Sequence, residues 1–271
     1  MANFSKYKIY FGSTLGAVVG GLSTYYGMIT FHGPPSPKWD FNWDKRAPQS
    51  LTKPVKNADD PKQQNEFNEN LAKNKSKAVR HIILIRHGQY NLSGKTDKAR
   101  ALTELGEKQA LATGERLKEL GLPYTNIIRS TMTRATQTAS LIQKYLPDVP
   151  VKDCKMLEEG APILPEPPHS TWRPELHQVF RDGARIEAAF RKYIHRAPPD
   201  QVNDSYDIIV CHGNVIRYFV CRALQIPANA WLRFSINHAS ITWLSVNPNG
   251  KVILHEYSDV GHMPPKYITT S

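Results

Sequence analysis

Two histidines stand at the ends of apolar segments, and each is followed by a glycine. The first is His87, in HIILIRHG (residues 81–88), and the second is His212, in IIVCHG (208–213). Glycine lets backbone N–H groups approach an oxyanion, and the N-terminus of the helix that follows favours a phosphate. A strand that ends at a polar turn is commonplace, but the repetition predicts that His87, His212 and Gly213 face a phosphate group together.

Three further residues could complete such a site. Arg86 precedes the first histidine, Arg134 lies in STMTRATQT (130–138), and Glu159 lies in LEEGAP (157–162). A guanidinium group binds phosphate through paired N–H donors. A lone histidine is usually structural, but two histidines, two arginines and a glutamate, each in its own sequence context, favour a site that handles phosphate.

The segments around these residues alternate between strand and helix patterns. Apolar runs predict strands at 81–86, 126–129, 207–211, 231–237, 240–246 and 251–257. Amphipathic stretches predict helices at 102–121, 133–146, 182–196 and 214–224. We therefore expect an α/β three-layer sandwich, with a mostly parallel central sheet and helices on both faces. The ligand of such a sheet lies at the carboxyl ends of its strands, where both histidines fall.

The composition narrows the class of partner. The net charge is +11, and residues 1–80 carry 12 Lys/Arg against 6 Asp/Glu. No helix or loop concentrates this charge among aromatic residues, so we expect no nucleic acid partner. A modest positive excess fits an anionic substrate or an anionic membrane surface. The three cysteines form no CxxC pair and no ligand-spaced cluster, so neither a disulfide framework nor a metal site is expected.

A segment of 23 residues without a formal charge, Ile9–Phe31, follows a short tail of residues 1–8. As a helix it would reach roughly 34 Å, which is enough to span a bilayer core. A cleaved secretory signal would need a small-x-small cleavage site, and a buried helix would need a long hydrophobic partner. We predict a single-pass transmembrane helix at 9–31, and the lysines on both sides leave its orientation open.

Residues 32–80 are rich in proline and polar residues, so we expect an extended linker that leads to a domain at 81–271. WDFNWD, at 39–44, is out of place there, because exposed tryptophan is unfavourable unless something covers it. Either this segment docks on the chain's own domain, or it is a self-association motif. The residues expected at such an interface are Trp39, Asp40, Trp43 and Asp44.

Four motifs resemble those of the histidine phosphatase superfamily, in its phosphoglycerate mutase-like branch. They occur in the family's order between residues 81 and 225, as RHG, LTELGEKQA, STMTRATQTA and HGNVIR. Other segments resemble the mitochondrial protein phosphatases of that branch over nearly the whole chain. These are LEEGAPILPEPP, RDGARIEAAFRKYIHRA, NVIRYFVCRALQ and GHMPP, together with the apolar span and WDFNWD.

The resemblance implies a two-step phosphoryl transfer that needs no metal and no other cofactor. His87 would attack phosphorus and form a phosphohistidine. Glu159 would protonate the leaving oxygen and then help water attack the intermediate. Glu158 is adjacent, and the choice of Glu159 follows the family's pattern, in which the acid directly precedes Gly160. The residues implied as phosphate ligands are Arg86, His87, Arg134, His212 and Gly213.

Three activities are compatible with this resemblance. In sugar-phosphate mutases a longer, Trp-containing segment follows RHG and closes the site, whereas here 14 residues, 88–101, separate His87 from Leu102. We expect an open site that admits a phosphorylated protein loop, and therefore a phosphatase for phosphoserine and phosphothreonine. A phosphoglycerate mutase-type enzyme and a membrane-tethered scaffold with minor activity are the alternatives.

The resemblance also implies partners and a location. We expect phosphorylated proteins as substrates, a homo-oligomer whose assembly activates the enzyme, and a mitochondrial membrane, with the outer membrane favoured and the inner one possible. Members that bind a Kelch-domain redox sensor use an acidic Glu-Ser-Gly-Glu stretch in this linker. The stretch QNEFNENLAKNKSK, at 64–77, lacks it, so that partner is in doubt here.

Overall fold

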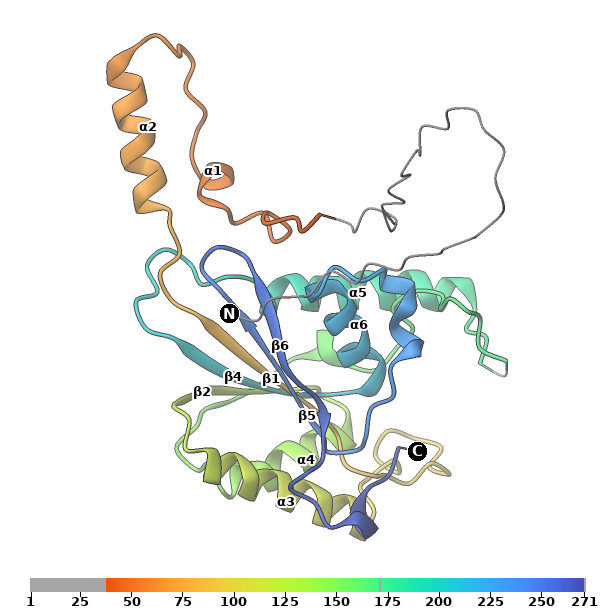
Figure 1. The fold of residues 1–271 in the computed structure, drawn as a ribbon. Helices are drawn as coiled ribbons and strands as arrows, with labels where there is room; N and C mark the ends of the chain where they lie inside the picture. Colours follow the sequence, from red (N-terminus) through yellow and green to blue (C-terminus); the bar gives the residue numbers. More distant parts are fainter. Residues whose placement is uncertain (1–37, 171, 271) are drawn as a thin grey trace, which may run out of the picture. The chain divides into compact units, whose positions relative to one another are not determined.

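The computed structural model describes residues 38–170 and 172–270, and Trp39–Ser271 form one compact unit (Figure 1). The expected tail at 1–8 and the expected transmembrane helix at 9–31 lie outside the described residues. Within the described residues, no helix is both long enough and apolar enough to cross a bilayer.

A six-stranded sheet lies at the centre of this unit. Its strands are β1 (Arg80–Arg86), β2 (Tyr124–Arg129), β3 (Val151–Asp153), β4 (Ser205–Cys211), β5 (Ile241–Val246) and β6 (Val252–Asp259). Their order across the sheet is β3-β2-β4-β1-β5-β6. The first four of these pair in parallel, whereas β5 pairs antiparallel with both β1 and β6. The mostly parallel sheet expected from the sequence is confirmed.

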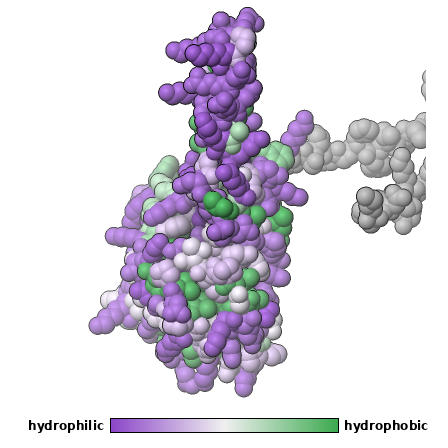
Figure 2. All heavy atoms as spheres, turned by 90° about the vertical axis from the view of Figure 1, so that its left-hand side faces the viewer, coloured by the Kyte–Doolittle hydropathy of each residue, from purple (hydrophilic) through white to green (hydrophobic). Residues whose placement is uncertain are grey.

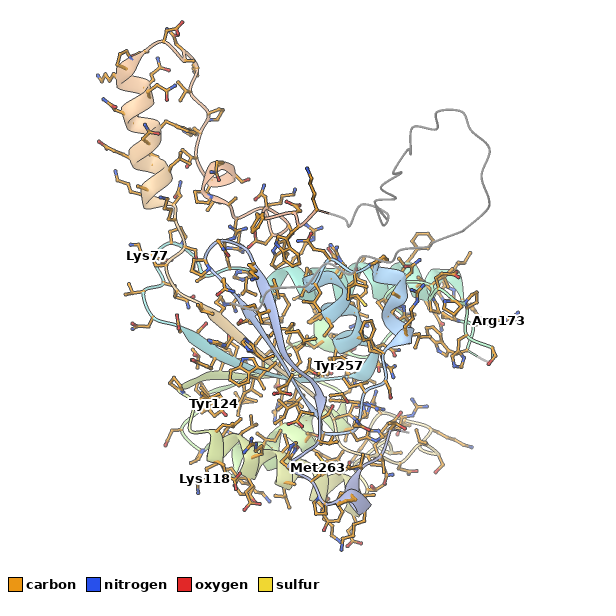
Figure 3. All side chains as sticks on the ribbon, in the orientation of Figure 1. Lys77, Lys118, Tyr124, Arg173, Tyr257 and Met263 are labelled. Carbon is orange, nitrogen blue, oxygen red and sulfur yellow. The ribbon has the colours of Figure 1, made fainter. Side chains whose placement is uncertain are left out.

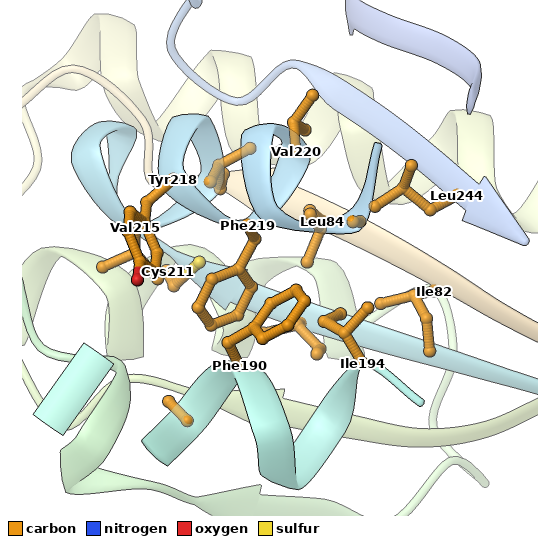
Figure 4. Close-up of a cluster of buried hydrophobic side chains, with 14 of the residues drawn as sticks. Ile82, Leu84, Phe190, Ile194, Cys211, Val215, Tyr218, Phe219, Val220 and Leu244 are labelled. Carbon is orange, nitrogen blue, oxygen red and sulfur yellow. The ribbon is translucent and has the colours of Figure 1, made fainter. Parts of the chain in front are cut away.

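Helices cover both faces of this sheet (Figure 1). They are α3 (Glu104–Leu120) and α4 (Thr133–Gln143) on one face, and α5 (Leu176–Tyr193) and α6 (Gly213–Ala223) on the other. In β1, Ile83 and Ile85 belong to the core cluster under α3 and α4, while Ile82 and Leu84 belong to the cluster under α5 and α6 (Figure 4). A strand buried on both faces is apolar without alternation, which explains the run IILI. The three-layer sandwich is confirmed.

Side chains of both helix layers fill the space against the sheet (Figure 3). The ends of α3 follow from local chemistry, because the hydroxyl of Thr103 accepts the N–H of Gly106 and Gly121 adopts a left-handed φ of 60°. The helices expected at 102–121, 133–146 and 214–224 are found within three residues of their expected ends, and α5 begins six residues earlier than expected.

The strand expected at 231–237 is wrong. Residues Ala228–Arg233 form the short 3-10 helix η2, which follows Pro227. The apolar residues of this segment are buried in different places: the indole N–H of Trp231 donates to the carbonyl of Ile163 at 2.9 Å, and Ile236 belongs to the core cluster under α6. Apolar residues that are buried separately in a loop gave the same sequence pattern as a buried strand. The remaining short helices are α1 (Pro48–Leu51), η1 (Lys155–Leu157) and η3 (Pro265–Tyr267).

The segment WDFNWD, at 39–44, docks on the chain's own domain. Trp39 and Trp43 pack against the cluster under α5 and α6, and the indole N–H of Trp43 donates to the carbonyl of Gly250 at 2.8 Å. Asp44 forms a buried ion pair with Arg196 at 2.7 Å. One of the two alternatives for this segment is therefore seen within a single chain, and self-association stays a prediction.

The rest of the expected linker is not uniformly extended, because α2 occupies Pro61–Lys73. Asp60 caps this helix by accepting the N–H of Lys62 at 2.9 Å. None of its residues is buried, and its surface is hydrophilic (Figure 2). A helix whose apolar face consists of the half-buried Phe67 and Leu71 was not visible as a hydrophobic pattern in the sequence.

Candidate active site

The site begins with the pairing of β1 and β4. These neighbours are in register with Arg86 opposite Cys211, and the N–H of His87 donates to the carbonyl of Cys211 at 3.0 Å. The next residue on each strand is a histidine, so both rings emerge at the same edge of the sheet. The ring centroids of His87 and His212 lie 5.1 Å apart, and their exposed fractions are 2% and 0%.

The hydrogen bonds of His87 determine which ring nitrogen carries the hydrogen. Its Nδ1 lies 2.8 Å from the carbonyl oxygen of Gly88, which can only accept, so Nδ1 carries the hydrogen. Its Nε2 receives the Nε–H of Arg134 at 3.2 Å and therefore presents a lone pair. Burial, together with the nearby His212, Arg134 and Arg86, holds the pKa of His87 well below its ordinary value. The ring is neutral, and Nε2 can act as a nucleophile.

Two glycines fix the turn that follows His87. A Cβ on Gly88 would collide with the carbonyl oxygen of Gly106, and a Cβ on Gly106 would collide with the carbonyl oxygen of Gln89. The first turn of α3 therefore packs directly on the backbone of this turn. The N–H of Gly88 also donates to the hydroxyl of Thr138 in α4 at 3.0 Å. Both helices on this face thus hold the backbone of the turn that follows His87.

Arg134 is the second residue of α4 and is 3% exposed. Besides its bond to His87, its guanidinium carbon lies 4.7 Å from the centre of the Tyr90 ring, a cation–π contact. Its NH1 lies 3.8 Å from a carboxylate oxygen of Asp97. The other oxygen of Asp97 accepts both the N–H and the hydroxyl of Thr133, at 2.9 and 2.7 Å.

Arg86 and His212 flank the nucleophile on other sides. The NH1 of Arg86 donates to the carbonyls of Ile236 and Thr270, both at 2.7 Å, which fixes the guanidinium plane. The Nε2 of His212 lies 2.7 Å from the hydroxyl of Ser130. Burial lowers the pKa of His212 well below its ordinary value, so the ring is neutral. Gly213 opens α6 directly beside them, with Arg86 Nε 3.5 Å from the place of a Cβ.

Glu159 faces the same group of cations. Its carboxylate accepts the N–H of Gly160 at 3.1 Å and the N–H of Asn214, in the first turn of α6, at 3.4 Å. Burial raises the pKa of this carboxyl above its ordinary value, although those two bonds and the charges of Arg134 and Arg86 act in the opposite direction. A raised pKa keeps more of the carboxyl protonated, as a general acid requires.

Glu158 points elsewhere, and its carboxylate accepts the hydroxyl of Thr131. The guanidinium of Arg185, from α5, donates to the backbone carbonyls of Glu158 and Glu159 at 2.6 and 3.1 Å and to that of Met156 at 2.9 Å. This clamp fixes the backbone so that Glu159, rather than its neighbour, approaches the two arginines.

Several buried polar atoms around His87 have no hydrogen-bond partner within the described part of the chain. They include Arg86 Nε, Arg134 NH1 and His212 Nδ1. Buried donors are normally satisfied, so a cluster of free ones implies a ligand. The set fits an oxyanion, because two of its members are cationic and a neutral histidine completes it. A phosphoryl group offers oxygens for all of them at once.

Comparison with known proteins agrees with this geometry. A family model described as "Histidine phosphatase superfamily (branch 1)" matches residues 82–162 and 164–259. The chain belongs to this superfamily. A relative from Drosophila mojavensis, named "Serine/threonine-protein phosphatase Pgam5, mitochondrial", is 56% identical over 233 residues, covering 85% of this chain and 80% of the relative. A relative of the same name from Drosophila pseudoobscura pseudoobscura is 56% identical over 237 residues, covering 87% and 82%.

Solved structures resemble the chain in fold. A phosphoglycerate mutase from Plasmodium falciparum is 38% identical, with a TM-score of 0.50, and the match covers 70% of this chain and 96% of that one. A protein titled "Mycobacterial hydrolase 1" is 22% identical with a TM-score of 0.51, covering 67% and 99%, and supports the fold alone. Family and relatives together identify this histidine phosphatase superfamily member as a phosphatase enzyme.

In this superfamily member the structure brings together the residues expected around phosphate, and it adds others. The residues expected at an oligomer interface, in WDFNWD, lie elsewhere. Ser130 follows the end of β2, so the rule that ligands meet parallel strand ends could have found it. Asn214 follows Gly213, so its place in a helix's first turn was also readable. Arg185 lies in the quoted segment RDGARIEAAFRKYIHRA and Asp97 in the segment after RHG, but nothing in either segment indicated a contact with the site.

Proposed function

We propose that the chain is a mitochondrial protein phosphatase that hydrolyses phosphoserine and phosphothreonine through a phosphohistidine on His87. The observation that carries this proposal is a neutral, buried imidazole whose Nε2 lone pair lies among phosphate-binding side chains, with Glu159 beside them. The names of relatives 53–56% identical to the chain support the substrate class and the location.

In the first step, Nε2 of His87 forms a bond to phosphorus while the ester P–O bond breaks. The proton of the Glu159 carboxyl goes to the leaving serine or threonine oxygen. Arg86, Arg134 and His212 donate to the phosphoryl oxygens, where charge spreads in the transition state. The ring becomes positive as it attacks, and the carbonyl of Gly88 stabilises that charge through the Nδ1–H.

In the second step, water attacks phosphorus and gives a proton to the Glu159 carboxylate. The P–N bond breaks, inorganic phosphate leaves, and His87 returns to its neutral form with a lone pair on Nε2. The same carboxyl thus acts as acid and then as base, and the raised pKa of Glu159 favours the protonated form that the first step needs.

The rim of the site supports a protein substrate. Residues 91–100, in the connection from β1 to α3, are exposed apart from Gly94, and we infer that this short segment leaves an approach for a phosphorylated loop. The mutase name of the Plasmodium falciparum structure favours a second candidate, a sugar-phosphate enzyme. Turnover of phosphoserine, phosphothreonine and phosphotyrosine peptides, compared with 3-phosphoglycerate, separates the two.

The nucleophile gives the direct test. In the full chain, His87→Ala is expected to abolish both peptide hydrolysis and the acid-labile phosphoenzyme, because no other lone pair occupies that position. His255→Ala is the matched control, since His255 is an exposed histidine on β6 that bonds Ser245 at 2.9 Å. Near-normal turnover of His87→Ala would contradict the proposal.

We also propose that residues 9–31 anchor the protein in the membrane, on the strength of their charge-free length. Deletion of residues 1–31 is expected to release the protein from membranes. Extraction of the full chain by alkaline carbonate would argue against a spanning helix.

Finally, we propose that WDFNWD takes part in assembly and that assembly activates the enzyme. Trp39 and Trp43 are only partly buried against the chain's own domain, so part of each ring remains available to a second copy. The double variant Trp39→Ala/Trp43→Ala is expected to lower both the mass by light scattering and the turnover of the same sample. An unchanged mass would contradict self-association, and a smaller but equally active particle would contradict activation alone.

A further inference from the structure

We propose that His238 is a further phosphate-binding residue of this site, donating from its Nε2–H to an oxygen of the phosphoryl group. The inference rests on the proposed function, which places a phosphoryl group at His87. His238 lies between η2 and β5 and did not stand out in the sequence. Its ring centroid lies 5.7 Å from that of His87 and 6.5 Å from that of Tyr90.

His238 is 2% exposed, and its Nε2 is buried without a hydrogen-bond partner among the described residues. The other ring nitrogen, Nδ1, is 2.9 Å from the hydroxyl of Thr269. A buried imidazole nitrogen is normally satisfied. The unpartnered atom therefore resembles Arg86 Nε, Arg134 NH1 and His212 Nδ1, which surround the same nucleophile.

A chain of hydrogen bonds assigns the proton of His238. The N–H of Gln89 donates to Oε1 of Gln109 at 2.8 Å, which identifies Nε2 of Gln109 as the donor end of that amide. Gln109 Nε2 donates to the carbonyl of Tyr267 at 2.6 Å and to the hydroxyl of Thr269 at 2.8 Å. The Thr269 oxygen accepts this hydrogen, and we assign its own hydrogen to His238 Nδ1, 2.9 Å away. In that tautomer the ring carries its hydrogen on Nε2, as a donor.

The ring stays neutral in this position. Burial, and then the charge of Arg86, lower the pKa of His238 to about 3. A neutral donor adds a hydrogen bond without adding charge to a site that already holds two guanidinium groups.

Backbone bonds fix the ring beside the nucleophile. The N–H of His238 donates to the carbonyl of Thr269 at 2.9 Å, and the N–H of Ala239 donates to the carbonyl of His87 at 3.2 Å. The residue is thus tied to the nucleophile on one side and to the C-terminal segment on the other. A donor held this rigidly is pre-organised for a ligand and loses little entropy when it binds one.

Three substitutions at His238 distinguish phosphate binding by Nε2 from a purely structural role of the ring. In His238→Gln the side-chain amide nitrogen can occupy the place of Nε2, whereas in His238→Asn the amide reaches only the place of Nδ1 and can bond Thr269. His238→Ala has neither group. If Nε2 binds phosphate, Gln retains most of the activity, while Asn and Ala each lose roughly 10- to 100-fold in kcat/KM, the range for one hydrogen bond to a charged group.

The experiment measures binding as well as turnover, so that it does not depend on the substrate. Full-length wild type and the three variants are titrated with orthovanadate and with inorganic phosphate, and their unfolding temperatures are recorded. Affinity in the order wild type, Gln, then Asn and Ala together supports the proposal. His262→Asn is the control, because His262 also has a buried, unpartnered nitrogen but bonds Thr113 instead of lying against His87.

Two results would overturn the inference. One is equal vanadate affinity in all variants, and the other is full activity in His238→Asn, which would show that only the Thr269 side of the ring matters. Failure of the proposed function looks different: wild type would then bind vanadate with the expected dependence on His238 but would not hydrolyse phosphopeptides.

Discussion

The role of Glu159 can be tested through the leaving group. Glu159→Gln removes the acidic proton and leaves a side chain of nearly the same shape, whose carbonyl can still accept one of the N–H groups of Gly160 and Asn214. Substrate binding is therefore expected to change little. Loss of a general acid costs roughly 10²- to 10⁴-fold when the leaving group is a poor one, such as the alkoxide of phosphoserine.

An activated ester changes this expectation. The nitrophenolate of p-nitrophenyl phosphate leaves without a proton, so the first step survives in Glu159→Gln, while the second step still lacks its base. The variant is expected to release a burst of about one nitrophenol per active site and then to stall as the phosphohistidine. With a phosphoserine peptide it is expected to show neither burst nor phosphoenzyme.

The raised pKa of Glu159 gives the pH dependence its sign. Burial disfavours the carboxylate, so the protonated form persists above the ordinary pKa of a glutamate. Phosphoenzyme formation from a phosphoserine peptide is expected to be fastest below that raised pKa and to fall as the pH rises through it. Single-turnover rates in Glu159→Gln are expected to lack this fall.

Glu158→Gln is the matched control, because it changes the adjacent carboxylate, which bonds Thr131 instead of facing the arginines. It is expected to behave like wild type with both substrates. If Glu158→Gln carried the larger loss, or if Glu159→Gln lost the same factor in the rate of the first step with both esters, the assignment of the acid would be refuted.

Two further predictions concern charges near the core and the site. Asp44→Asn removes one partner of an ion pair whose side chains are 3% and 1% exposed, so urea unfolding is expected to show a loss of about 3 kcal/mol, with the exposed Asp40→Asn as the unchanged control. Burial raises the pKa of Asp44, but the hydrogen bonds and charge of Arg196 outweigh burial and hold the pKa below its usual value. The ion pair therefore stabilises the fold at pH values above the unfolded-state pKa, and this stabilisation is lost as the pH falls through the folded-state pKa. Equal acid sensitivity of wild type and Asp44→Asn would contradict this. Asp97→Asn removes a negative charge 3.8 Å from Arg134 and is expected to lower KM for phosphopeptides without lowering kcat, whereas a raised KM would mean that Asp97 positions the arginine.

The pair of histidines could be predicted because its geometry is carried by strands. Two apolar runs that each end in His-Gly become parallel neighbours, and their register puts Arg86 opposite Cys211, so the following residues have to meet. Arg134 was predictable for a related reason, since it lies in the first turn of the helix after another parallel strand, β2. Periodic patterns determine such positions.

The rest depended on contacts between distant segments. Glu158 and Glu159 are equivalent by composition, and the choice between them depends on a clamp by Arg185 from α5. The strand expected at 231–237 failed because Trp231 is buried by a loop rather than by a sheet neighbour. The proposed role of His238 depends on its hydrogen bond with Thr269, and these two residues are neighbours only in the folded chain. Short-range pattern carries no information about these approaches.

One helix connects the docked segment to the acid of the site. Trp43 contacts Phe190 of α5, with ring centroids 5.9 Å apart, and Asp44 bonds Arg196 just beyond the end of that helix. Arg185, five residues before Phe190, holds the backbone of Glu159. A change in how residues 39–44 are covered therefore acts on the helix that positions Glu159, while His87 is held from the opposite face by α3 and α4. Activation through this segment would accordingly alter proton transfer to the leaving group more than it alters phosphate binding.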